Sequence, residues 1–448
     1  MGGAVRDLLR GQKVMDWDLA TDALPEEVIA LFHRKNIAGN DKNRPQPRSF
    51  VVPTGIRHGT VTVHFKGLSL EVTTFRSESG YSDRRRPDKV EFGHSIDEDL
   101  SRRDFTMNAA AYALPSGPFV DPFEGLKDIK KHVIRAVGKA DERFSEDGLR
   151  PIRALRFVSQ LGFTLDEELL KAIPGAIPFT AEVASERIRD ELEKIIASER
   201  PSAALLLMEK TGILRLLIPE LAACRVVGKD FLSGMGRHRF DLLEHSLLAC
   251  DFAARTGQSP GVRLAALYHD IGKLTSGQKD ESGNISFHRH EKQSAVMARQ
   301  ILVRFRYPKA EIDRTCHLIE EHMFNYSENW TDVAVRRFII RVGPENLDDL
   351  FALRRADAYA MAGEEAPRDF LFPLTSHIEK VLTAGGALRL KDLTVSGKDL
   401  MAQGIPSGKT MGIILHELLE AVLNDQSLNT REKLLEIAGK LNARYAKS

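Results

Sequence analysis

The chain contains only three cysteines among its 448 residues, and Cys224, Cys250 and Cys316 lie far apart in the sequence. Their odd number and wide spacing exclude a disulfide framework and a zinc site made of closely spaced cysteines. This usage is typical of proteins in a reducing compartment, so we expect a cytoplasmic protein.

Long apolar runs are also absent. No segment approaches the roughly 20 apolar residues that a membrane helix needs. The first residues carry charges from Arg6 onward and contain no apolar stretch like that of a secretory signal. The sequence therefore predicts neither a membrane partner nor export.

The chain has almost no excess of charge, with a net charge of +1, so a nucleic-acid partner would have to bind a local basic surface. One third of the chain does concentrate basic residues, namely Arg84, Arg85, Arg86, Arg102, Arg103, Lys127, Lys130, Lys131, Arg135, Arg143, Arg150, Arg153 and Arg156. A charge run by itself more often marks a solvated face. The motifs must decide between the two interpretations.

The chain is too long for a single hydrophobic core, so we expect three or four modules. Near the N-terminus, residues 61–65 and 70–75 predict two strands joined by a turn at Lys66-Gly67. Residues 25–32 predict a helix, and residues 36–53, rich in Gly, Asn, Pro and Arg, predict a surface insertion.

Strand signals nearly vanish after about residue 125. Helical apolar periodicity recurs in residues 149–161, 184–196, 202–217, 242–254, 262–268, 292–305 and 411–423. The predicted fold class is an α/β head followed by an all-α array, mainly α overall.

The first motif combines adjacent glycines with two carboxylates. Gly2 and Gly3 precede a helical stretch, where they would let the backbone approach a triphosphate closely at a helix N-terminus. Asp16 and Asp18 are two apart, so on a strand they would face the same side and hold two Mg²⁺ ions for phosphoryl transfer. Glu71, on a neighbouring predicted strand, is a candidate third carboxylate, with an ordinary surface position as the equal alternative.

The second motif places charged residues three apart. Asp147 is followed by Arg150, Arg153 and Arg156, so successive members would lie side by side on a helix. An Asp beside an Arg offers an acceptor next to a forked donor, which matches the pairing edges of cytosine and adenine and mismatches guanine and uracil. The alternative is an ordinary helix with an intrahelical ion pair.

These motifs occur in a fixed order over roughly the first two hundred residues: Gly-Gly-Ala-Val-Arg-Asp (2–7), Asp-Trp-Asp (16–18), His-Gly-Thr (58–60), Glu-Val-Thr-Thr-Phe (71–75), Arg-Arg-Asp-Phe-Thr-Met-Asn-Ala (102–109), Asp-Pro-Phe (121–123), Glu-Asp-Gly-Leu-Arg (146–150) and Arg-Ala-Leu-Arg-Phe (153–157). In this respect the chain resembles the class II CCA-adding enzymes, the tRNA nucleotidyltransferases that share their head with bacterial poly(A) polymerases. The tail is similar too, with Val-Ser-Gly-Lys-Asp-Leu at 395–400.

The resemblance implies a head of polymerase-β-like fold, followed by helical neck, body and tail. It places these regions at residues 1–125, 126–200, 201–375 and 376–448. It implies tRNA, CTP and ATP as partners and Mg²⁺ as cofactor, bound by Asp16 and Asp18. It assigns nucleotide binding to Gly3, Arg6, Arg103, Asp147, Arg150, Arg153 and Arg156.

The chain departs from the family pattern at its start and at residues 36–53. Family members carry a helix and most of a strand before the two glycines, whereas Met1 directly precedes Gly2 here. We expect a start site placed too far downstream rather than a head that lacks its first strand. Residues 36–53 are longer than the family leads us to expect. Residues 76–88 are of full length, which speaks against an enzyme that adds only CC.

A second candidate site lies in the predicted body, at about residues 240–360. His-Asp-Ile-Gly-Lys at 269–273 resembles the HD phosphohydrolase superfamily, and histidine with carboxylate ligands suits Mn²⁺, Fe²⁺, Ni²⁺ or Mg²⁺. The candidate ligands are His245, His269, Asp270, His290, His322 and Asp357. His238, His288 and His317 lie nearby and rank lower.

The main hypothesis is a CTP/ATP:tRNA nucleotidyltransferase that adds CCA. The alternatives are an adenosine-adding enzyme or poly(A) polymerase, a metal-dependent phosphohydrolase with an impaired head that only binds tRNA, and an RNA-binding protein without catalysis.

Overall fold

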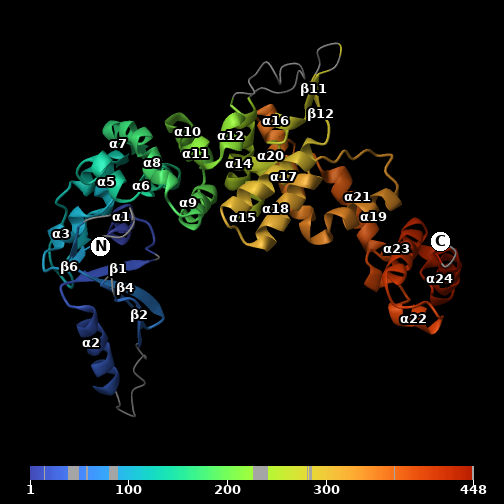
Figure 1. Cartoon of the computed structure of the whole chain (residues 1–448), viewed down its shortest axis with the longest axis horizontal. Helices are drawn as coiled ribbons and strands as arrows, with labels where there is room; N and C mark the ends of the chain where they lie inside the picture. The colour runs from blue at the N-terminus through green and yellow to red at the C-terminus, as the bar shows by residue number, and fades with distance from the viewer. Residues whose placement is uncertain are drawn as a thin grey trace. The chain divides into compact units, whose positions relative to one another are not determined.

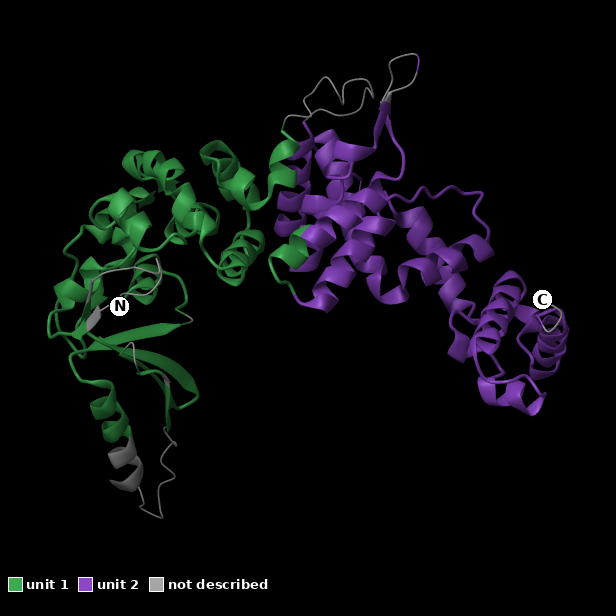
Figure 2. Ribbon diagram, viewed as in Figure 1, with its two compact units in different colours: residues 1–226, 301–307 green, residues 227–300, 308–448 purple. Residues whose placement is uncertain are grey.

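The computed structural model describes residues 1–14, 16–38, 50–56, 59–79, 89–225, 241–279, 281, 285–367 and 369–445. The chain forms two compact units, drawn in green and purple in Figure 2. The first consists of residues 1–226 with 301–307, and the second of residues 227–300 with 308–448. Among the described residues, no helix combines the length and apolar character needed to cross a bilayer.

A four-stranded mixed sheet organises the start of the first unit (Figure 1). Its order is β1-β4-β3-β2, with β1 parallel to β4 and the other pairs antiparallel. The strands and flanking helices are α1 (Gly3–Leu9), β1 (Trp17–Thr21), α2 (Pro25–Ala38), β2 (Phe50–Gly55), β3 (Thr60–Phe65) and β4 (Leu68–Thr74). Val28 of α2 packs on Val61, Val63 and Val72, which form the core of the sheet.

The predicted hairpin is confirmed. Lys66 and Gly67 join β3 to β4 with φ angles of 51° and 79°, the left-handed conformation that a two-residue hairpin turn requires. The predicted insertion at residues 36–53 is wrong at both ends, because α2 continues to Ala38 and β2 begins at Phe50. Residues 39–49 lie outside the described part of the chain.

Short elements complete the head. β5 (Arg76–Ser79) pairs with β6 (Lys89–Phe92), and residues 80–88 between them, which include Arg84, Arg85 and Arg86, are outside the described residues. Then follow α3 (Ile96–Ser101), η2 (Thr106–Asn108), β7 (Ala111–Tyr112), β8 (Phe119–Val120), α4 (Gly125–Lys131) and β9 (Val133–Ile134).

Helices dominate the rest of the first unit, as predicted. They are α5 (Ala140–Glu146), α6 (Arg150–Leu161), α7 (Glu167–Ala172), η3 (Pro174–Ala176), α8 (Ile177–Ala181), α9 (Ser185–Ala197), α10 (Pro201–Thr211), α11 (Ile213–Leu217) and α12 (Pro219–Ala223), with β10 (Thr164–Leu165) paired to β9. Residues 202–217 form two helices rather than the single one predicted, because Gly212 adopts a φ of 85° and ends α10.

The second unit is mainly helical. Its first part contains α14 (Leu242–Arg255), α15 (Pro260–Tyr268), α16 (Lys273–Ser276), β11 (Gly277–Lys279), β12 (Ile285–Phe287), α17 (His290–Arg304), α18 (Lys309–Glu321), α19 (Asp332–Val342), η4 (Pro344–Asn346) and α20 (Leu347–Ala362). Helix α17 begins in this unit and ends in the first.

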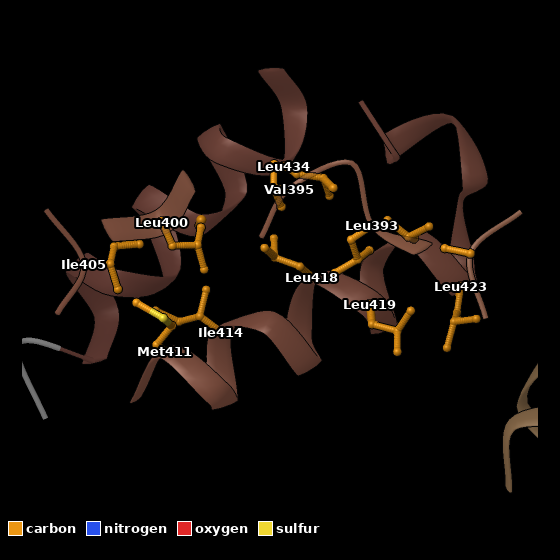
Figure 3. Close-up of a cluster of buried hydrophobic side chains, with 13 residues drawn as sticks. Leu393, Val395, Leu400, Ile405, Met411, Ile414, Leu418, Leu419, Leu423 and Leu434 are labelled. Carbon is orange, nitrogen blue, oxygen red and sulfur yellow. The ribbon is translucent and has the colours of Figure 1, made fainter. Parts of the chain in front are cut away.

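The C-terminal part of the second unit has its own core. It contains α21 (Phe372–Thr383), η5 (Leu390–Asp392), α22 (Gly397–Ala402), α23 (Lys409–Asn424), η6 (Gln426–Leu428) and α24 (Arg431–Tyr445). Leu400, Ile414, Leu418 and Leu434 are fully buried there (Figure 3). The tail motif has a structural role, because Ser396 and Asp399 form the capping box that begins α22.

Candidate functional site

Two glycines open α1 as predicted. Gly2 is the N-cap with a φ of 68°, and its N–H donates to the carbonyl of Ala110 at 3.1 Å. A Cβ at Gly2 would lie 2.6 Å from Nη1 of Arg103, so a side chain there would displace this guanidinium. The glycine turn thus permits a close approach between the start of α1 and Arg103.

The two carboxylates reach the same cavity from different local structures. Asp18 lies on β1, whereas Asp16 lies in a bend before the strand, so the prediction that both lie on one strand is wrong. Trp17, between them, is 40% exposed. Glu71 of β4 is in register with Asp18 but does not line the cavity, and its role as a third carboxylate stays a prediction.

This head cavity has a volume of about 560 Å³. It is lined by Gly3, Ala4, Arg6, Asp7, Lys13, Val14, Asp16, Asp18, Arg103, Asp104, Asn108, Arg153, Arg156, Phe157, Gln160 and Lys194. Six basic side chains therefore surround a space that also contains the two predicted metal-binding carboxylates. Cations suit a triphosphate, and carboxylate oxygens suit Mg²⁺, so the lining fits a nucleotide with its metal ions.

Hydrogen bonds hold Arg6, and an ion pair holds Arg103, in the cavity lining. Arg6 donates to Asn108 Oδ1 at 2.9 Å and to both carboxylate oxygens of Asp7 at 2.8 Å. Arg103 lies 3.7 Å from Asp99, and burial lowers the pKa of its guanidinium. The cations are therefore held in place before any ligand arrives.

Two arginines of α6 are held by buried carboxylates, and the sequence motifs did not predict either pairing. Arg153 pairs with Asp104 at 2.7 Å, and Arg156 with Glu191 of α9 at 2.5 Å. Burial acts to raise the pKa of Asp104, but Arg153 and a hydrogen bond from Asn108 outweigh it and lower the pKa to about 2. Asp104 belongs to a motif quoted above, whereas Glu191 had no signal beyond its place in a predicted helix.

The proposed base-reading residues do not line the cavity in this structure. Asp147 has an extended backbone between α5 and α6 instead of lying on a helix, and Arg150 is the first residue of α6. Arg187 of α9 donates to both carboxylate oxygens of Asp147, at 2.7 and 3.2 Å. Arg150 instead pairs with Glu146 at 2.5 Å. The spacing in the sequence predicted that Asp147 and Arg150 lie close together, but it did not predict that Arg187 and Glu146 are their partners.

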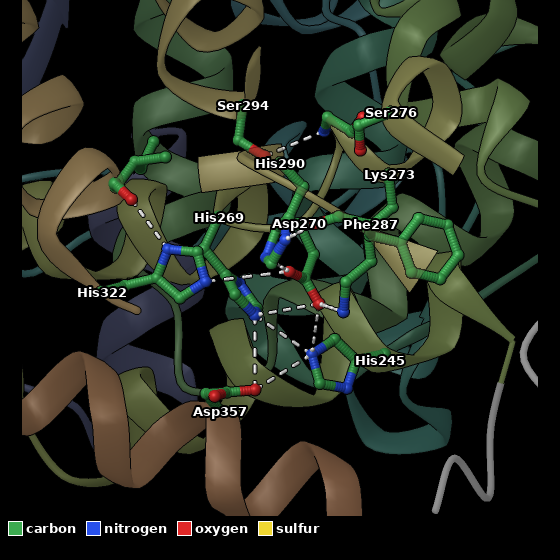
Figure 4. Close-up of polar contacts among 12 residues, drawn as sticks. His245, His269, Asp270, Lys273, Ser276, Phe287, His290, Ser294, His322 and Asp357 are labelled. Carbon is green, nitrogen blue, oxygen red and sulfur yellow. Dashed lines mark hydrogen bonds and ion pairs between the residues drawn. The ribbon is translucent and has the colours of Figure 1, made fainter. Parts of the chain in front are cut away.

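The second unit brings all six candidate metal ligands together (Figure 4). They come from five places in the chain: His245 from α14, His269 and Asp270 from the end of α15, His290 from the start of α17, His322 from the end of α18 and Asp357 from α20. Each is at most 5% exposed. We call this set the HD cluster.

Backbone carbonyls orient three of the imidazoles. Nδ1 of His269, His290 and His322 lies 2.8, 3.0 and 2.7 Å from the carbonyl oxygens of Ala266, Phe287 and Ile319. A carbonyl only accepts, so each Nδ1 carries the proton and donates it, which leaves the lone pair on Nε2. Donation of the second ring N–H to a backbone carbonyl is the usual arrangement of metal-binding histidines, and all three Nε2 atoms lie near the carboxylate of Asp270.

Asp270 lies at the centre of the HD cluster. Its Oδ2 is 3.2 Å from Nε2 of His245 and 3.4 Å from Nε2 of His269, while its Oδ1 is 3.1 Å from Nε2 of His290. The potential ligand atoms form two groups, His245 with His269, Asp270 and Asp357, and Asp270 with His290 and His322. The donor set of imidazole nitrogens and carboxylate oxygens fits one divalent ion, or two bridged by Asp270.

Burial and neighbouring charges shift the pKa values of two histidines of the HD cluster in opposite directions. Burial lowers the pKa of His322 to about 3, and His269 acts in the same direction. Burial also acts to lower the pKa of His245, but hydrogen bonds to Asp270 and Asp357 outweigh it and raise the pKa to about 9. In the metal-free protein, therefore, His322 is neutral and His245 is protonated at pH 7.

The lower-ranked histidines lie elsewhere. Nε2 of His317 donates to the carbonyl of Val342 at 2.7 Å, and His288 is exposed. His238 lies outside the described residues.

Comparisons with known proteins agree with this geometry. Residues 1–135 match the family model of the poly A polymerase head domain, residues 162–225 that of the probable RNA and SrmB-binding site of polymerase A, and residues 242–362 the HD domain. A CCA-adding enzyme of Lactobacillus johnsonii is 32% identical over 437 residues, which cover 97% of this chain and 91% of the relative. The chain belongs to the CCA-adding enzyme family.

Further members of the CCA-adding enzyme family resemble the chain in sequence and in structure. The enzyme of Geobacillus thermodenitrificans is 46% identical over 222 residues, about half of each chain. The crystal structure of the Bacillus stearothermophilus CCA-adding enzyme in complex with CTP superposes with a TM-score of 0.69 at 29% identity. It covers 100% of this chain and 93% of that one, so the predicted polymerase-β-like head with helical regions is confirmed.

Proposed function

We propose that the chain is a template-independent nucleotidyltransferase that adds cytidine, cytidine and adenosine to the 3′ end of tRNA from CTP and ATP. The observation that supports this best is the head cavity, in which Asp16 and Asp18 lie among six basic side chains. Membership of the CCA-adding enzyme family supports the same reaction. Since tRNA and nucleoside triphosphates are cytoplasmic, the proposal places the protein in the cytoplasm.

In the proposed reaction, Asp16 and Asp18 hold the divalent ions. Mg²⁺ bound there would lower the pKa of the attacking 3′-hydroxyl and neutralise charge on the leaving pyrophosphate. Gly3, Arg6 and Arg103 bind the triphosphate, because the start of α1 presents N–H groups beside two fixed guanidinium groups. Arg153 and Arg156 contact phosphates or brace the site through Asp104 and Glu191.

Base selection is assigned to Asp147 and Arg150. Asp147 would accept from the exocyclic amino group that cytosine and adenine share, and Arg150 would donate to the adjacent ring acceptor. Guanine or uracil would leave the Asp147 carboxylate facing a carbonyl, which discriminates strongly. Because Arg187 and Glu146 bind these side chains in the structure, the incoming base must share or replace those contacts.

One assay tests this function and its rival, an adenosine-adding enzyme or poly(A) polymerase. Three tRNAs that end before CCA, after C and after CC are each incubated with CTP, ATP or both, and the added nucleotides are counted. We expect two cytidines followed by one adenosine on the first tRNA. Adenosine added only to the CC end, or long adenosine tails, would establish the rival instead.

We also propose that the HD cluster is a metal-dependent phosphohydrolase acting on 3′ or 2′,3′-cyclic phosphates. The specific observation is the convergence of three Nε2 atoms on the carboxylate of buried Asp270. Mn²⁺, Fe²⁺, Ni²⁺ or Mg²⁺ fits this donor set and would activate water. Water adds to phosphorus, the ester oxygen leaves, and the proton from water passes to it. With each metal in turn, phosphate released from a 3′-phosphorylated nucleotide and ring-opened monophosphate formed from a 2′,3′-cyclic nucleotide measure this activity. No product from either substrate with any of the metals would exclude it.

A further inference from the structure

A second cavity lies in the second unit and is separate from the head cavity. Its volume is about 280 Å³. It is lined by Phe324, Asn325, Tyr326, Ser327, Glu328, Arg354, Phe370, Leu371, Pro373 and Leu374. We call it the body cavity.

The body cavity adjoins the HD cluster in two ways. Arg354, which lines it, donates Nη1 to Oδ2 of the metal-ligand candidate Asp357 at 2.8 Å. Phe324 and Asn325 follow the ligand candidate His322 by two and three residues, and the N–H of Phe324 donates to the carbonyl of His322 at 3.2 Å. Arg354 and the chain segment after His322 therefore link the lining of the cavity to the cluster.

Aromatic rings supply part of the apolar lining. Phe324 is buried against Phe338, with ring centroids 5.3 Å apart, and is fixed in place. Phe370 is 39% exposed although it lines a cavity, so a flat ligand could cover it. Aromatic side chains stack with any nucleobase, because every base has a π face.

A chain of hydrogen bonds fixes the polar group of Tyr326. Nε2 of His377 lies 2.8 Å from Asp332 Oδ1, and Nδ1 of His377 lies 3.1 Å from the Tyr326 hydroxyl. A carboxylate only accepts, so Nε2 of His377 carries a proton and donates it to Asp332. His377 thereby holds the Tyr326 hydroxyl in the cavity lining, where its oxygen can accept from an N–H or O–H of a ligand.

We propose that the body cavity binds the nucleoside of the phosphoester hydrolysed at the HD cluster. The base stacks on Phe370, an amino or hydroxyl group of the nucleoside donates to Tyr326, and Arg354 holds the phosphate beside Asp357. At about 280 Å³ the cavity lies at the small end of ligand sites, so it takes one nucleoside rather than a stack of several. The identity of the substrate rests on the phosphohydrolase function proposed above, whereas binding of a nucleoside to the cavity does not depend on it.

Binding and hydrolysis are measured separately with the full-length protein and 3′-AMP as the probe. Titration calorimetry compares the unchanged protein with Phe370→Ala and Tyr326→Phe. We expect affinity to fall at least about fivefold when stacking on Phe370 is lost, and about three- to tenfold when the Tyr326 hydroxyl is lost. Leu382→Ala, which changes an exposed residue of α21 outside the lining, should leave binding unchanged.

Glycerol 2-phosphate, a phosphomonoester without a base, serves as the second substrate. Phe370→Ala and Tyr326→Phe should lower kcat/KM for 3′-AMP by the same factors and leave kcat/KM for glycerol 2-phosphate unchanged. The head binds nucleotides too, so the quantity compared is the difference between proteins that differ only in the body cavity. Equal 3′-AMP affinity in all four proteins would overturn the proposal. Binding that weakens as expected without any hydrolysis would reject the phosphohydrolase and keep the binding site.

Discussion

At the scale of single residues, the chemistry depends on a few charges whose surroundings differ. Asp16 and Asp18 lie at an open cavity, where ions and nucleotide can reach them. The HD cluster is the opposite case, because its six side chains are buried and the charges of its carboxylates and histidines balance one another. Charge that is exposed can exchange ligands quickly, whereas buried charge must be matched by an ion or a proton.

Asp18→Asn and Asp16→Asn should each lower nucleotide incorporation into tRNA at least about 10²-fold. Each change removes a metal-binding charge with little change of volume. Incorporation of labelled CTP and ATP measures the effect, and thermal unfolding verifies that the head remains folded. Trp17→Phe, between the two carboxylates, is the matched control and should retain activity. Full activity of either Asn variant would remove that carboxylate from the mechanism.

Metal binding to the HD cluster should release at least one proton at pH 7. His245, with its pKa raised to about 9, carries a proton that the metal must displace, whereas His322, with its pKa lowered to about 3, is already neutral. Apparent affinity should therefore rise about tenfold per pH unit up to about pH 9 and then level off. Calorimetry of Mn²⁺ binding in buffers of different ionisation enthalpy counts the protons.

Two variants distinguish the contributions of His322 and His245 to metal affinity and to proton release. His322→Ala should weaken Mn²⁺ binding and leave the number of released protons unchanged, whereas His245→Ala should weaken it and release about one proton fewer. His317→Ala, at a histidine that donates to a backbone carbonyl, should change neither quantity. Proton release that is unaffected by His245→Ala would assign the proton to another group.

At the scale of elements, close approach of backbones assembles the HD cluster. Gly272 lies between the ligand candidate Asp270 and α16, and its N–H donates to Oγ of Ser294 at 2.8 Å. A Cβ at Gly272 would lie 2.4 Å from the carbonyl oxygen of His290 and 2.5 Å from the backbone nitrogen of Ser294. Only glycine allows the turn after Asp270 to pack against the start of α17, which carries His290.

Gly272→Ala should therefore displace the start of α17 and separate His290 from Asp270. We expect a loss of about 1–3 kcal/mol of stability in the second unit and a reduced metal content. Thermal unfolding and elemental analysis of the purified protein measure the two effects. Gly261→Ala in α15 is the control, because its nearest neighbour would be Oγ1 of Thr315 at 3.8 Å, an ordinary contact. An unchanged metal content in Gly272→Ala would show that α17 can adjust.

At the scale of the whole molecule, the two candidate sites lie in different compact units, each with its own buried residues. Their activities should therefore be separable. His269→Ala and Asp270→Ala should remove metal-dependent phosphohydrolysis and leave incorporation into tRNA within about twofold of the unchanged protein. Asp16→Ala with Asp18→Ala should do the reverse. Both activities assayed on each variant decide the matter, and loss of both in one variant that remains folded would mean that the sites depend on each other.

Local patterns in the sequence were enough for much of the fold. The hairpin at Lys66-Gly67 and helix α6 follow from turn chemistry and apolar periodicity, which act between near neighbours in the chain. Residues 39–49 and 80–88 lie outside the described part of the chain, so the inference against CC-only addition from the length of residues 76–88 stays a prediction. The four-part division into head, neck, body and tail also stays a prediction.

The sequence by itself determined which residues can do chemistry: the carboxylates Asp16 and Asp18, the stripe from Asp147 to Arg156, and the histidines around Asp270. Their types and spacings carry that information, because proton affinity, charge and metal preference belong to the side chain. Only the tertiary structure decided their partners. Arg187 binds Asp147 across 40 residues of sequence, and Arg354 links Asp357 to the body cavity. Such contacts form when separate helices pack, and packing between distant segments leaves no periodic trace in one sequence.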